Sequence, residues 1–372
     1  MSAGRPLRIL ISAGEPSGDR YGGQVIRALR ARRPVAVTGC GGPAMLEAGA
    51  DLVARVDQLS ALGFLEVLQA LPRHLGLLGR LSQRARERYD LAILIDYPGF
   101  HLRLGERLRG AGVPVLQYVA PQLWAWRPGR ARQLCRAADR LAVILPFEPA
   151  WFEHRGIPCQ FVGHPLLDEP LPGQAQAREA LRIPPSERVL GIFPGSRRSE
   201  VSRNWPLFRG VGQRLLERGR CQRVLVAGTA HEAYPGGEGF EIHRHAARLV
   251  LAAATAALIK SGTTTLEAAC IGTPMVVGYR ASWSTQAIAR RLMTVDSISL
   301  VNLILPQPVV PEFWRWPLRE GRLAAALEPL LDPGSVQHRE QREALSRVQA
   351  SLGSPGAAAR VADLALTLLD SQ

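Results

Sequence analysis

Continuous apolar runs that end in glycine or proline recur along this chain, and they predict buried strands of a parallel sheet. The first run, "LRILISAG" at 7–14, is followed at 22–32 by "GGQVIRALRAR", in which apolar residues return with helical spacing. Further strand-like runs lie at 35–42, 90–100, 114–122, 140–148 and 159–168. Alternating strands and amphipathic helices indicate βαβ units, so we predict an α/β fold with a mainly parallel sheet.

A change of composition divides the chain. The stretch "EPLPGQAQAREALRIPPSER" at 169–188 is rich in proline, charge and glutamine, and a second strand series follows it. These later strand-like runs lie at 189–197, 221–230, 254–262 and 274–280. A length of 372 residues also suits two cores better than one. We therefore expect domains at 1–168 and 169–340, followed by a helical segment at 341–372.

Four strand ends carry the polar residues that we consider for ligand binding. They are "AGEPSGD" at 13–19, "IDYPGF" at 95–100, "PGSRRSE" at 194–200 and "KSGTTTLE" at 260–267. Ligands of open α/β sheets bind beyond the carboxyl ends of the strands, which is where these turns should lie.

The turn "KSGTTTLE" has the features of an anion site. We expect Ser261 and Thr263 to cap the helix that begins there, so that Gly262 and the first-turn amides face a ligand. Glu267, one turn later, is placed to accept two hydrogen bonds from a ribose diol. Lys260 adds a positive charge, or is an incidental survivor of an arginine-rich composition. The plain alternative is an ordinary helix cap with Glu267 as a solvated charge.

The turn "PGSRRSE" follows the same logic. Its glycine lets the backbone approach a ligand, beside Ser196, and Arg197 or Arg198 can fork onto a diphosphate. An ordinary basic loop is the alternative. The chain has no G-x-x-x-x-G-K-[ST], no clean G-x-G-x-x-G and no D-x-D pair. We therefore expect a phosphate ligand that is held by cations and helix ends, with no metal ion and no cofactor.

The first domain's turns are acidic. In "AGEPSGD", Ser17 or Asp19 can cap a helix beside Gly18, and the charges of Glu15 and Asp19 suit a hydroxyl-rich ligand better than a phosphate. Asp96 ends a wholly apolar strand, where a carboxylate is costly unless it opens into a crevice. It is therefore a candidate general base, and the alternative is that it caps the following turn.

Charge and composition narrow the setting. The net charge of +14 calls for an acidic partner, but a single lysine among 46 basic residues suggests a GC-rich gene, so charge alone does not indicate nucleic acid. Five cysteines with no C-x-x-C pair favour a reducing compartment. We find no signal peptide and no bilayer-spanning run, so we expect an intracellular protein or one that lies on a membrane. The apolar stretch at 62–81, with Leu65, Leu68 and Leu71, is either a core helix or a lipid contact.

Together the motifs resemble a known family. The ordered set "AGEPSGD", "QLSALGFLEVL", "IDYPGF", "YVAPQLWAWRPGR", "LPFE", "FVGHPLLD", "PGSRRSEV", "KSGTTTLEA", "VVGYR" and "LVNLIL…VPEF" is similar to lipid-A-disaccharide synthases from about residue 8 to about 330. The resemblance implies a GT-B glycosyltransferase with two Rossmann-like domains facing across a cleft, and a C-terminal helix that returns to the first domain. It implies inverting transfer of 2,3-diacylglucosamine from its UDP-sugar to 2,3-diacylglucosamine 1-phosphate (lipid X), giving the β-1,6-linked lipid A disaccharide 1-phosphate and UDP.

The resemblance also assigns roles. It places UDP on the second domain's turns, adds Asn302 to that site and makes Asp96 the base, with Glu15 as the alternative. Some family members have an acidic and an amide residue where this chain has Gly99 and His101, which leaves the role of those two side chains open. The apolar stretch at 62–81 becomes an acyl-chain or membrane contact, and the enzyme a peripheral protein on the cytoplasmic face of the inner membrane. A homodimer is compatible with the sequence.

Two other functions remain in view. Another GT-B protein that uses a UDP-hexosamine, such as a different lipid-linked transferase or a UDP-GlcNAc 2-epimerase, would share the fold and need no lipid X. A non-catalytic basic protein that binds nucleic acid or membrane would rest on net charge alone, and it would bind nucleic acid with a steep salt dependence.

Overall fold

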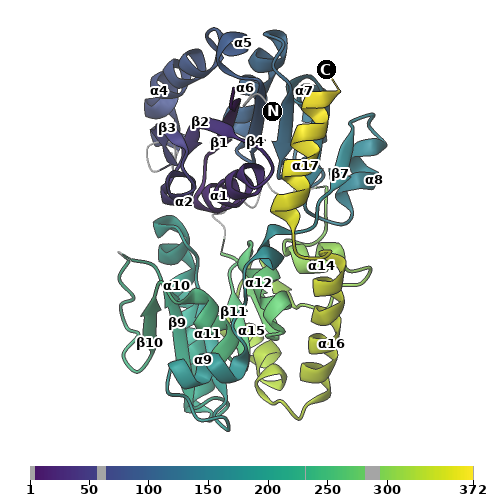
Figure 1. Cartoon of the computed structure of the whole chain (residues 1–372). Helices are drawn as coiled ribbons and strands as arrows, with labels where there is room; N and C mark the ends of the chain where they lie inside the picture. Colours follow the sequence, from purple (N-terminus) through teal and green to yellow (C-terminus); the bar gives the residue numbers. More distant parts are fainter. Residues whose placement is uncertain (1–4, 57–63, 231, 281–293, 372) are drawn as a thin grey trace. The chain divides into compact units, whose positions relative to one another are not determined.

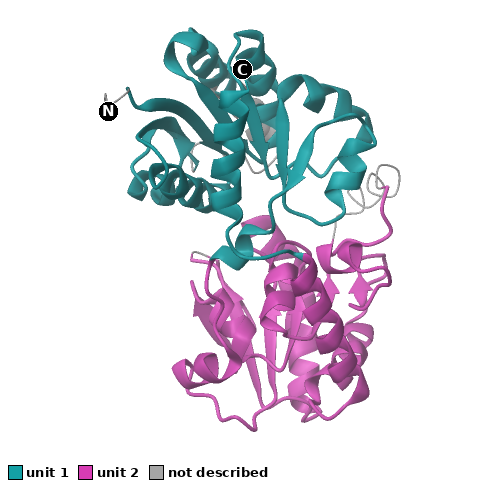
Figure 2. Ribbon diagram, turned by 45° about the vertical axis from the view of Figure 1, so that its right-hand side comes forward, with its two compact units in different colours: residues 1–168, 352–372 teal, residues 169–351 magenta. Residues whose placement is uncertain are grey.

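The structure is a computed structural model that describes residues 5–56, 64–230, 232–280 and 294–371. The chain forms two compact units, coloured along the sequence in Figure 1 and by unit in Figure 2. The first consists of Met1–Asp168 and Leu352–Gln372, and the second of Glu169–Ser351. The segment that belongs to the first unit therefore begins at Leu352. The sequence had placed its start at 341, inside a helix of the second unit.

In the described part of the first unit, seven parallel strands lie in the order β3-β2-β1-β4-β5-β6-β7. They are β1 (Leu7–Ala13), β2 (Val35–Gly41), β3 (Asp51–Arg55), β4 (Leu91–Ile95), β5 (Val115–Tyr118), β6 (Arg140–Val143) and β7 (Cys159–Phe161). Strands β1 and β4 are neighbours, with Ile11 beside Ile93. Every residue of β4 is buried because helices cover both faces of the sheet, which explains its unbroken apolar run.

The helices of this unit connect and cover these strands. They are α1 (Pro16–Arg30), α2 (Pro43–Glu47), α4 (Phe64–Ser82), α5 (Ala85–Arg88), α6 (Pro98–Gly110), α7 (Ala131–Ala137), α8 (Glu148–Glu153) and α17 (Ala357–Asp370), with 3-10 turns η1 (Pro128–Arg130) and η2 (Pro165–Asp168). Helices α4, α6 and α7 share one apolar core with the strands. Helix α17, yellow in Figure 1, packs against α1 and contacts β4, β5 and β6.

Helix α4 covers the apolar stretch predicted at 62–81. Its second half is core, because Leu77, Leu78 and Leu81 are buried, whereas Leu75 is 49% exposed. The side chains of Leu65, Leu68 and Leu71 lie outside the described part of the structure, so their lipid contact stays a prediction. Among the described residues, no helix combines the length and the apolar character that crossing a membrane requires.

In the second unit, the described residues form six parallel strands in the order β10-β9-β8-β11-β12-β13. They are β8 (Val189–Phe193), β9 (Arg223–Gly228), β10 (Glu241–Arg244), β11 (Ala256–Ile259), β12 (Met275–Gly278) and β13 (Glu312–Phe313). Its helices are α9 (Gln174–Ala180), α10 (Arg198–Glu217), α11 (Ala247–Ala253), α12 (Thr264–Ile271), α14 (Leu300–Ile304), α15 (Glu320–Leu327) and α16 (Val336–Ser351), with the 3-10 turn η3 (Pro329–Leu331). The predicted α/β fold with two parallel sheets is confirmed.

One carboxylate fixes the start of α17. Asp168 accepts hydrogen bonds from the amides of Gly356 at 2.6 Å, Ala357 at 3.0 Å and Ala358 at 3.0 Å, which are first-turn donors of that helix. The negative charge also lies at the positive end of the helix dipole. The C-terminal helix is thus tied to the residue at which the first stretch of this unit ends.

We predict that Asp168→Ala lowers the free energy of unfolding by about 1–2 kcal/mol, because it removes the acceptor for three helix-end amides. Asp168→Asn keeps one acceptor oxygen and should be affected less. Urea unfolding followed by circular dichroism measures both. Asp370→Ala, at the exposed far end of the same helix, is the control and should be neutral. An Asp168→Ala protein as stable as the control would contradict the capping role.

Candidate active site

The four polar turns meet in two adjacent pairs. In the first unit, β1 and β4 are neighbours. After β1 the chain continues to β2 on one side, and after β4 it continues to β5 on the other, so residues 14–16 lie beside residues 96–98. In the second unit the same holds for β8 and β11, which places 194–197 beside 260–263. Such switch points are where open α/β sheets bind ligands. Each unit thus has, among its described residues, a switch point at which two of the polar turns picked out in the sequence lie side by side.

Asp96 stands in an unusual backbone conformation. Its φ is 50° and that of Tyr97 is 51°, so two consecutive non-glycine residues are left-handed. The surrounding structure holds this turn at both backbone atoms of Asp96. Its N–H donates to the Tyr118 carbonyl at 2.9 Å, and its carbonyl accepts from His101 Nδ1 at 2.7 Å and from Gln117 Nε2 at 3.3 Å.

The side chain of His101 supports this turn through two hydrogen bonds. It is 1% exposed, and burial lowers its pKa to about 4, so the ring is neutral at pH 7. Because the Asp96 carbonyl can only accept, Nδ1 carries the proton, and Nε2 accepts from the Ser12 hydroxyl at 2.9 Å. His101 therefore joins β1 to the turn after β4.

The Asp96 carboxyl group has the electrostatics of a base that works near neutral pH. Burial, and next the negative charge of Glu15, raise its pKa to about 6. Its side chain still keeps partial solvent exposure, so a ligand can reach it. A carboxyl group whose pKa is raised by burial and by a neighbouring negative charge is typical of sites where protons are moved.

A close backbone approach explains the first glycine of "AGEPSGD". A Cβ on Gly14 would lie 2.2 Å from Cγ of Tyr97, so only glycine lets this ring cover the turn. The Tyr97 hydroxyl group also lies 2.8 Å from His74 Nε2, which connects the turn to α4. The two turns of the first unit therefore pack on each other directly.

The capping prediction for this turn is wrong. Helix α1 has Glu15 at its N-cap with no side-chain cap, and Ser17 makes no such bond either. Asp19 is buried and instead accepts from the amides of Gly42 at 2.6 Å, Ala44 at 3.0 Å and Met45 at 3.1 Å, at the start of α2. Asp19 therefore supports the neighbouring turn. This geometry favours a structural role for it over acceptor binding.

The turn before α12 also differs from its predicted caps. Thr263 is the N-cap residue and makes no side-chain cap, and the Ser261 hydroxyl donates to the Ile298 carbonyl at 2.6 Å. Gly262, with φ at 153°, adopts a conformation that side-chain-bearing residues avoid. The first-turn amides of α12 thus have no side-chain cap, which leaves the anion role of this helix end open to a ligand.

One glutamate that the sequence analysis missed joins the two turns of the second unit. Glu200 Oε1 lies 2.9 Å from Lys260 Nζ, and Oε2 accepts from the Ser196 amide at 3.1 Å. Burial works to raise the Glu200 pKa, but its hydrogen bond to Lys260 and the charge of Lys260 outweigh this and lower it. Gly195, with φ at 136°, has no room for a Cβ, which would lie 2.5 Å from Cβ of Glu200. The sequence feature that could have revealed Glu200 is its position as an acidic residue in the first turn of α10.

The remaining predicted donor-site residues divide in two. Ser196 and Arg197 are exposed at the start of α10. Glu267 is not a solvated surface charge: its side chain is 14% exposed and its Oε1 lies 3.0 Å from Arg248 Nε. Asn302 is buried, and its amide makes four hydrogen bonds that organise the backbone around 309–312. Asn302 therefore positions this segment, and a direct ligand contact would break those bonds.

Two more buried polar residues were missed because only tertiary partners reveal them. Asn204, fully buried on α10, donates to the Pro194 carbonyl at 2.8 Å and accepts from the Arg280 amide at 2.9 Å. Glu148 is 1% exposed and accepts from Trp124 Nε1 at 3.1 Å; burial raises its pKa to about 7. Within the described residues, no cluster of three or more His, Cys, Asp or Glu side chains suits a metal ion.

Comparisons with known proteins identify the relatives of this chain. Residues 9–359 match the family described as lipid-A-disaccharide synthetase. The lipid-A-disaccharide synthase of Anaeromyxobacter sp. (strain K) is 39% identical over 382 residues, which is 97% of either chain. That of Trichlorobacter lovleyi is 39% identical over 385 residues and the whole of both chains.

Solved structures at low identity share the fold. A glycotransferase of kitacinnamycin is 18% identical with a TM-score of 0.66, over 98% of this chain and 99% of the other. The UDP-GlcNAc 2-epimerase of Neisseria meningitidis, bound to UDP-GlcNAc, is 11% identical with a TM-score of 0.65, over 97% and 100%. These likenesses show a fold of GT-B type and by themselves no activity.

His101 should make stability depend on pH. Its pKa is about 4 in the folded chain against 6.5 when unfolded, so only the unfolded state binds the proton between these values. Stability is therefore lost as the pH falls through this window, and His101→Asn should remove about 2 kcal/mol of the loss between pH ~7 and pH ~4.5. Urea unfolding at both pH values measures it. Exposed His154→Asn is the control, and identical pH slopes in His101→Asn and wild type would exclude the buried neutral imidazole.

Proposed function

The chain belongs to the lipid-A-disaccharide synthase family of glycosyltransferases, which acts in lipid A biosynthesis, and from this premise we propose its reaction and its residues. We propose inverting transfer of 2,3-diacylglucosamine from UDP-2,3-diacylglucosamine to 2,3-diacylglucosamine 1-phosphate. The products are the β-1,6-linked disaccharide 1-phosphate and UDP. The observation that carries the proposal is the match of the family over nearly the whole chain, with an acidic site at one switch point and a basic one at the other.

The second unit would bind the donor. The amides at Gly262 and Thr263 and the guanidinium group of Arg197 would hold the diphosphate, since helix ends and arginine both favour phosphate. Glu267 would accept hydrogen bonds from the ribose while Arg248 orients it. These groups would stabilise the negative charge that builds on the departing UDP, as a metal ion does elsewhere.

Lys260 has a different role in this proposal. Its ammonium group is already paired with Glu200, which also holds the Ser196 amide. Lys260 would therefore fix the spacing of the two phosphate-binding turns. Its net contribution to the charge around the diphosphate is small, because Glu200 cancels it.

The first unit would supply the base. Asp96 would take the proton of the acceptor's 6-hydroxyl as that oxygen attacks the anomeric carbon and the bond from this carbon to the diphosphate breaks. Glu15 is the alternative base, and otherwise it tunes Asp96 through its charge. Ser17 and Gly18 remain proposed neighbours of the acceptor.

We also propose that the enzyme works at the cytoplasmic surface of the inner membrane. Its lipid substrates lie there, its net charge is +14, and Trp126 and Trp316 are 40% and 62% exposed. Cations attract anionic lipids, and tryptophan favours the headgroup region. A homodimer remains compatible with this arrangement.

An assay with purified protein in detergent tests the function. The UDP-diacylglucosamine donor and radiolabelled lipid X should give disaccharide and UDP, followed by thin-layer chromatography. A parallel tube contains UDP-GlcNAc alone, because the fold is shared with an epimerase of that substrate. Turnover of UDP-GlcNAc without disaccharide, by folded protein that binds UDP, would reject the proposed reaction.

The base assignment predicts a specific pH dependence. Asp96→Asn should reduce turnover about 10²–10⁴-fold while UDP affinity is kept. In the wild type, kcat/KM should fall as the pH drops below about 6, because Asp96 must be deprotonated to accept a proton. Glu15→Gln removes a neighbouring negative charge, so this midpoint should move to lower pH with activity retained. Loss of turnover in Glu15→Gln and its survival in Asp96→Asn would make Glu15 the base.

A further inference from the structure

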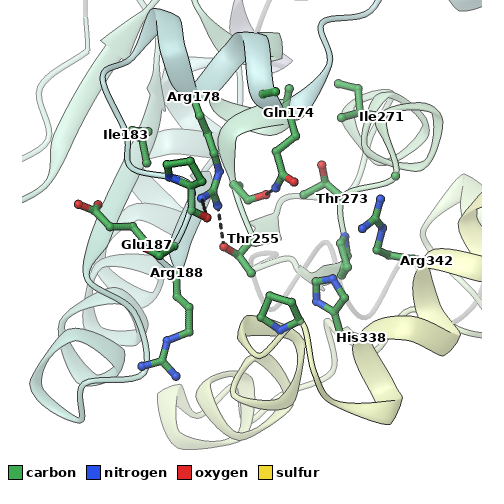
Figure 3. Close-up of a pocket in the computed structure, with 18 of the residues that line it drawn as sticks. Gln174, Arg178, Ile183, Glu187, Arg188, Thr255, Ile271, Thr273, His338 and Arg342 are labelled. Atoms are coloured by element: carbon green, nitrogen blue, oxygen red, sulfur yellow. Dashed lines mark hydrogen bonds between the residues drawn. The ribbon is translucent and has the colours of Figure 1, made fainter.

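The second unit has a cavity at the opposite edge of its sheet from the proposed donor turns. It has a volume of about 920 Å³ and opens where β8, β11 and β12 begin, between α9 and α16 (Figure 3). The donor turns follow the carboxyl ends of β8 and β11, about 15 Å away along the strands. A volume of this size holds a small molecule.

A buried positive charge forms one wall. Arg178 of α9 is 7% exposed, and its hydrogen bonds all go to neutral oxygens: the carbonyls of Ala253, Pro184 and Pro185 and the hydroxyl group of Thr255, with the last shown in Figure 3. No carboxylate among the described residues lies within ion-pair distance of it. Burial lowers its pKa, and the negative charge of Glu187 acts in the opposite direction. Buried guanidinium groups are rarely left without an ion-pair partner.

Helix α16 contributes two more groups from across the cavity (Figure 3). His338 is 5% exposed, and its Nδ1 donates to the Leu330 carbonyl at 2.7 Å, which leaves Nε2 without a hydrogen bond to the described residues. Arg342, one turn later, is exposed and likewise makes no hydrogen bond or ion pair with them. Opposite Arg178, a ligand therefore meets the donors of Arg342 and one acceptor, His338 Nε2, which can bind the hydroxyl group of a singly protonated phosphate.

The acids of the lining offset only part of the positive charge. Glu187 forms an ion pair with Arg223, which lies outside the lining, at 2.9 Å. Glu179 is exposed at the rim. Arg188, which completes the cationic set, donates to the Gly219 carbonyl. The cavity therefore presents an excess of positive charge.

The rest of the lining is apolar, with Ile183, Pro185, Ile271, Pro274 and Pro333. We propose that this cavity is a second binding site, separate from the donor site, for a phosphate monoester that carries a compact apolar group. The guanidinium fork of Arg342 matches phosphate geometry, the buried charge of Arg178 adds attraction, and the apolar wall takes the remainder of the ligand. The proposal does not depend on the glycosyl-transfer reaction.

Fluorine NMR with 4-fluorophenyl phosphate tests the site. The full-length protein is saturated with UDP so that the donor site is filled, and broadening or shift of the ¹⁹F signal is titrated. Saturable binding in the presence of UDP is expected. An absence of binding, or its complete loss on adding UDP, overturns the proposal.

Matched variants locate the binding. Arg342→Glu should weaken it about tenfold, since a charge-assisted hydrogen bond from the guanidinium group is lost, and His338→Gln should weaken it because Nε2 no longer accepts the proton of a singly protonated phosphate. Arg347→Glu, on the same helix but outside the lining, is the matched charge control and should bind as the wild type does. Equal affinities in all three variants overturn the site. Arg342 is exposed, so its variant should fold even where His338→Gln does not.

Competition identifies the source of the phosphate. Glucose 6-phosphate represents a soluble metabolite, and dihexanoyl phosphatidic acid represents a lipid headgroup. Displacement of the fluorinated probe by one of them supports the site and assigns its natural ligand class. Inorganic phosphate is the third competitor, and a probe that none of the three displaces overturns the proposal, because the site must accept at least the phosphate group itself.

Discussion

Both sites depend on one feature of strand order. In each sheet two neighbouring parallel strands are followed by connections that run to opposite sides of the sheet. The connections after β1 and β4 diverge, as do those after β8 and β11, so no helix crosses the edge between them. The turn residues at that edge must provide their own support, and they can also meet a ligand. Strand order therefore determines where a ligand can bind, and the side chains at each switch point determine which ligand and which reaction the site can support.

Buried polar side chains provide the support that the missing crossover cannot. His101 holds the left-handed turn at Asp96, and Glu200 holds two turns of the second unit at once. Asn204 and Asn302 do the same for backbone segments beside them. Each places a donor or acceptor on a specific backbone atom, and a buried polar group left unpaired costs about 1–3 kcal/mol. The geometry of these turns is therefore fixed by a few hydrogen bonds, while the apolar cores fix only the strands that carry them.

The sequence predicted those features of the fold that follow from local patterns of apolar residues, glycine and proline. Central strands such as β4 are buried on both faces, so their apolar runs were visible, and the turns after them were found by glycine and proline. Edge strands β3, β10 and β13 were missed because they are short and part-exposed, with charged residues that give no apolar run. The caps at Ser261 and Asp19 were wrong because these side chains bind partners that are 37 and more than 20 residues away. Glu200 and Asn204 were missed for the same reason: their role depends on which turns the fold brings together.

The two switch points differ in charge, and this difference suits the glycosyl transfer that we propose. The first unit gathers carboxylates, and burial, followed by the charge of Glu15, raises the pKa of Asp96, the base that we propose. In the second unit, Arg197 is exposed and the start of α12 has no side-chain cap. The ion pair with Glu200 neutralises Lys260, whose charge therefore stabilises the two turns. A carboxylate must gain a proton as the acceptor attacks, and the leaving diphosphate must gain stabilisation at the same moment. In the reaction that we propose, these two needs are met by different units: the base comes from the first unit, and the donors to the diphosphate come from the second.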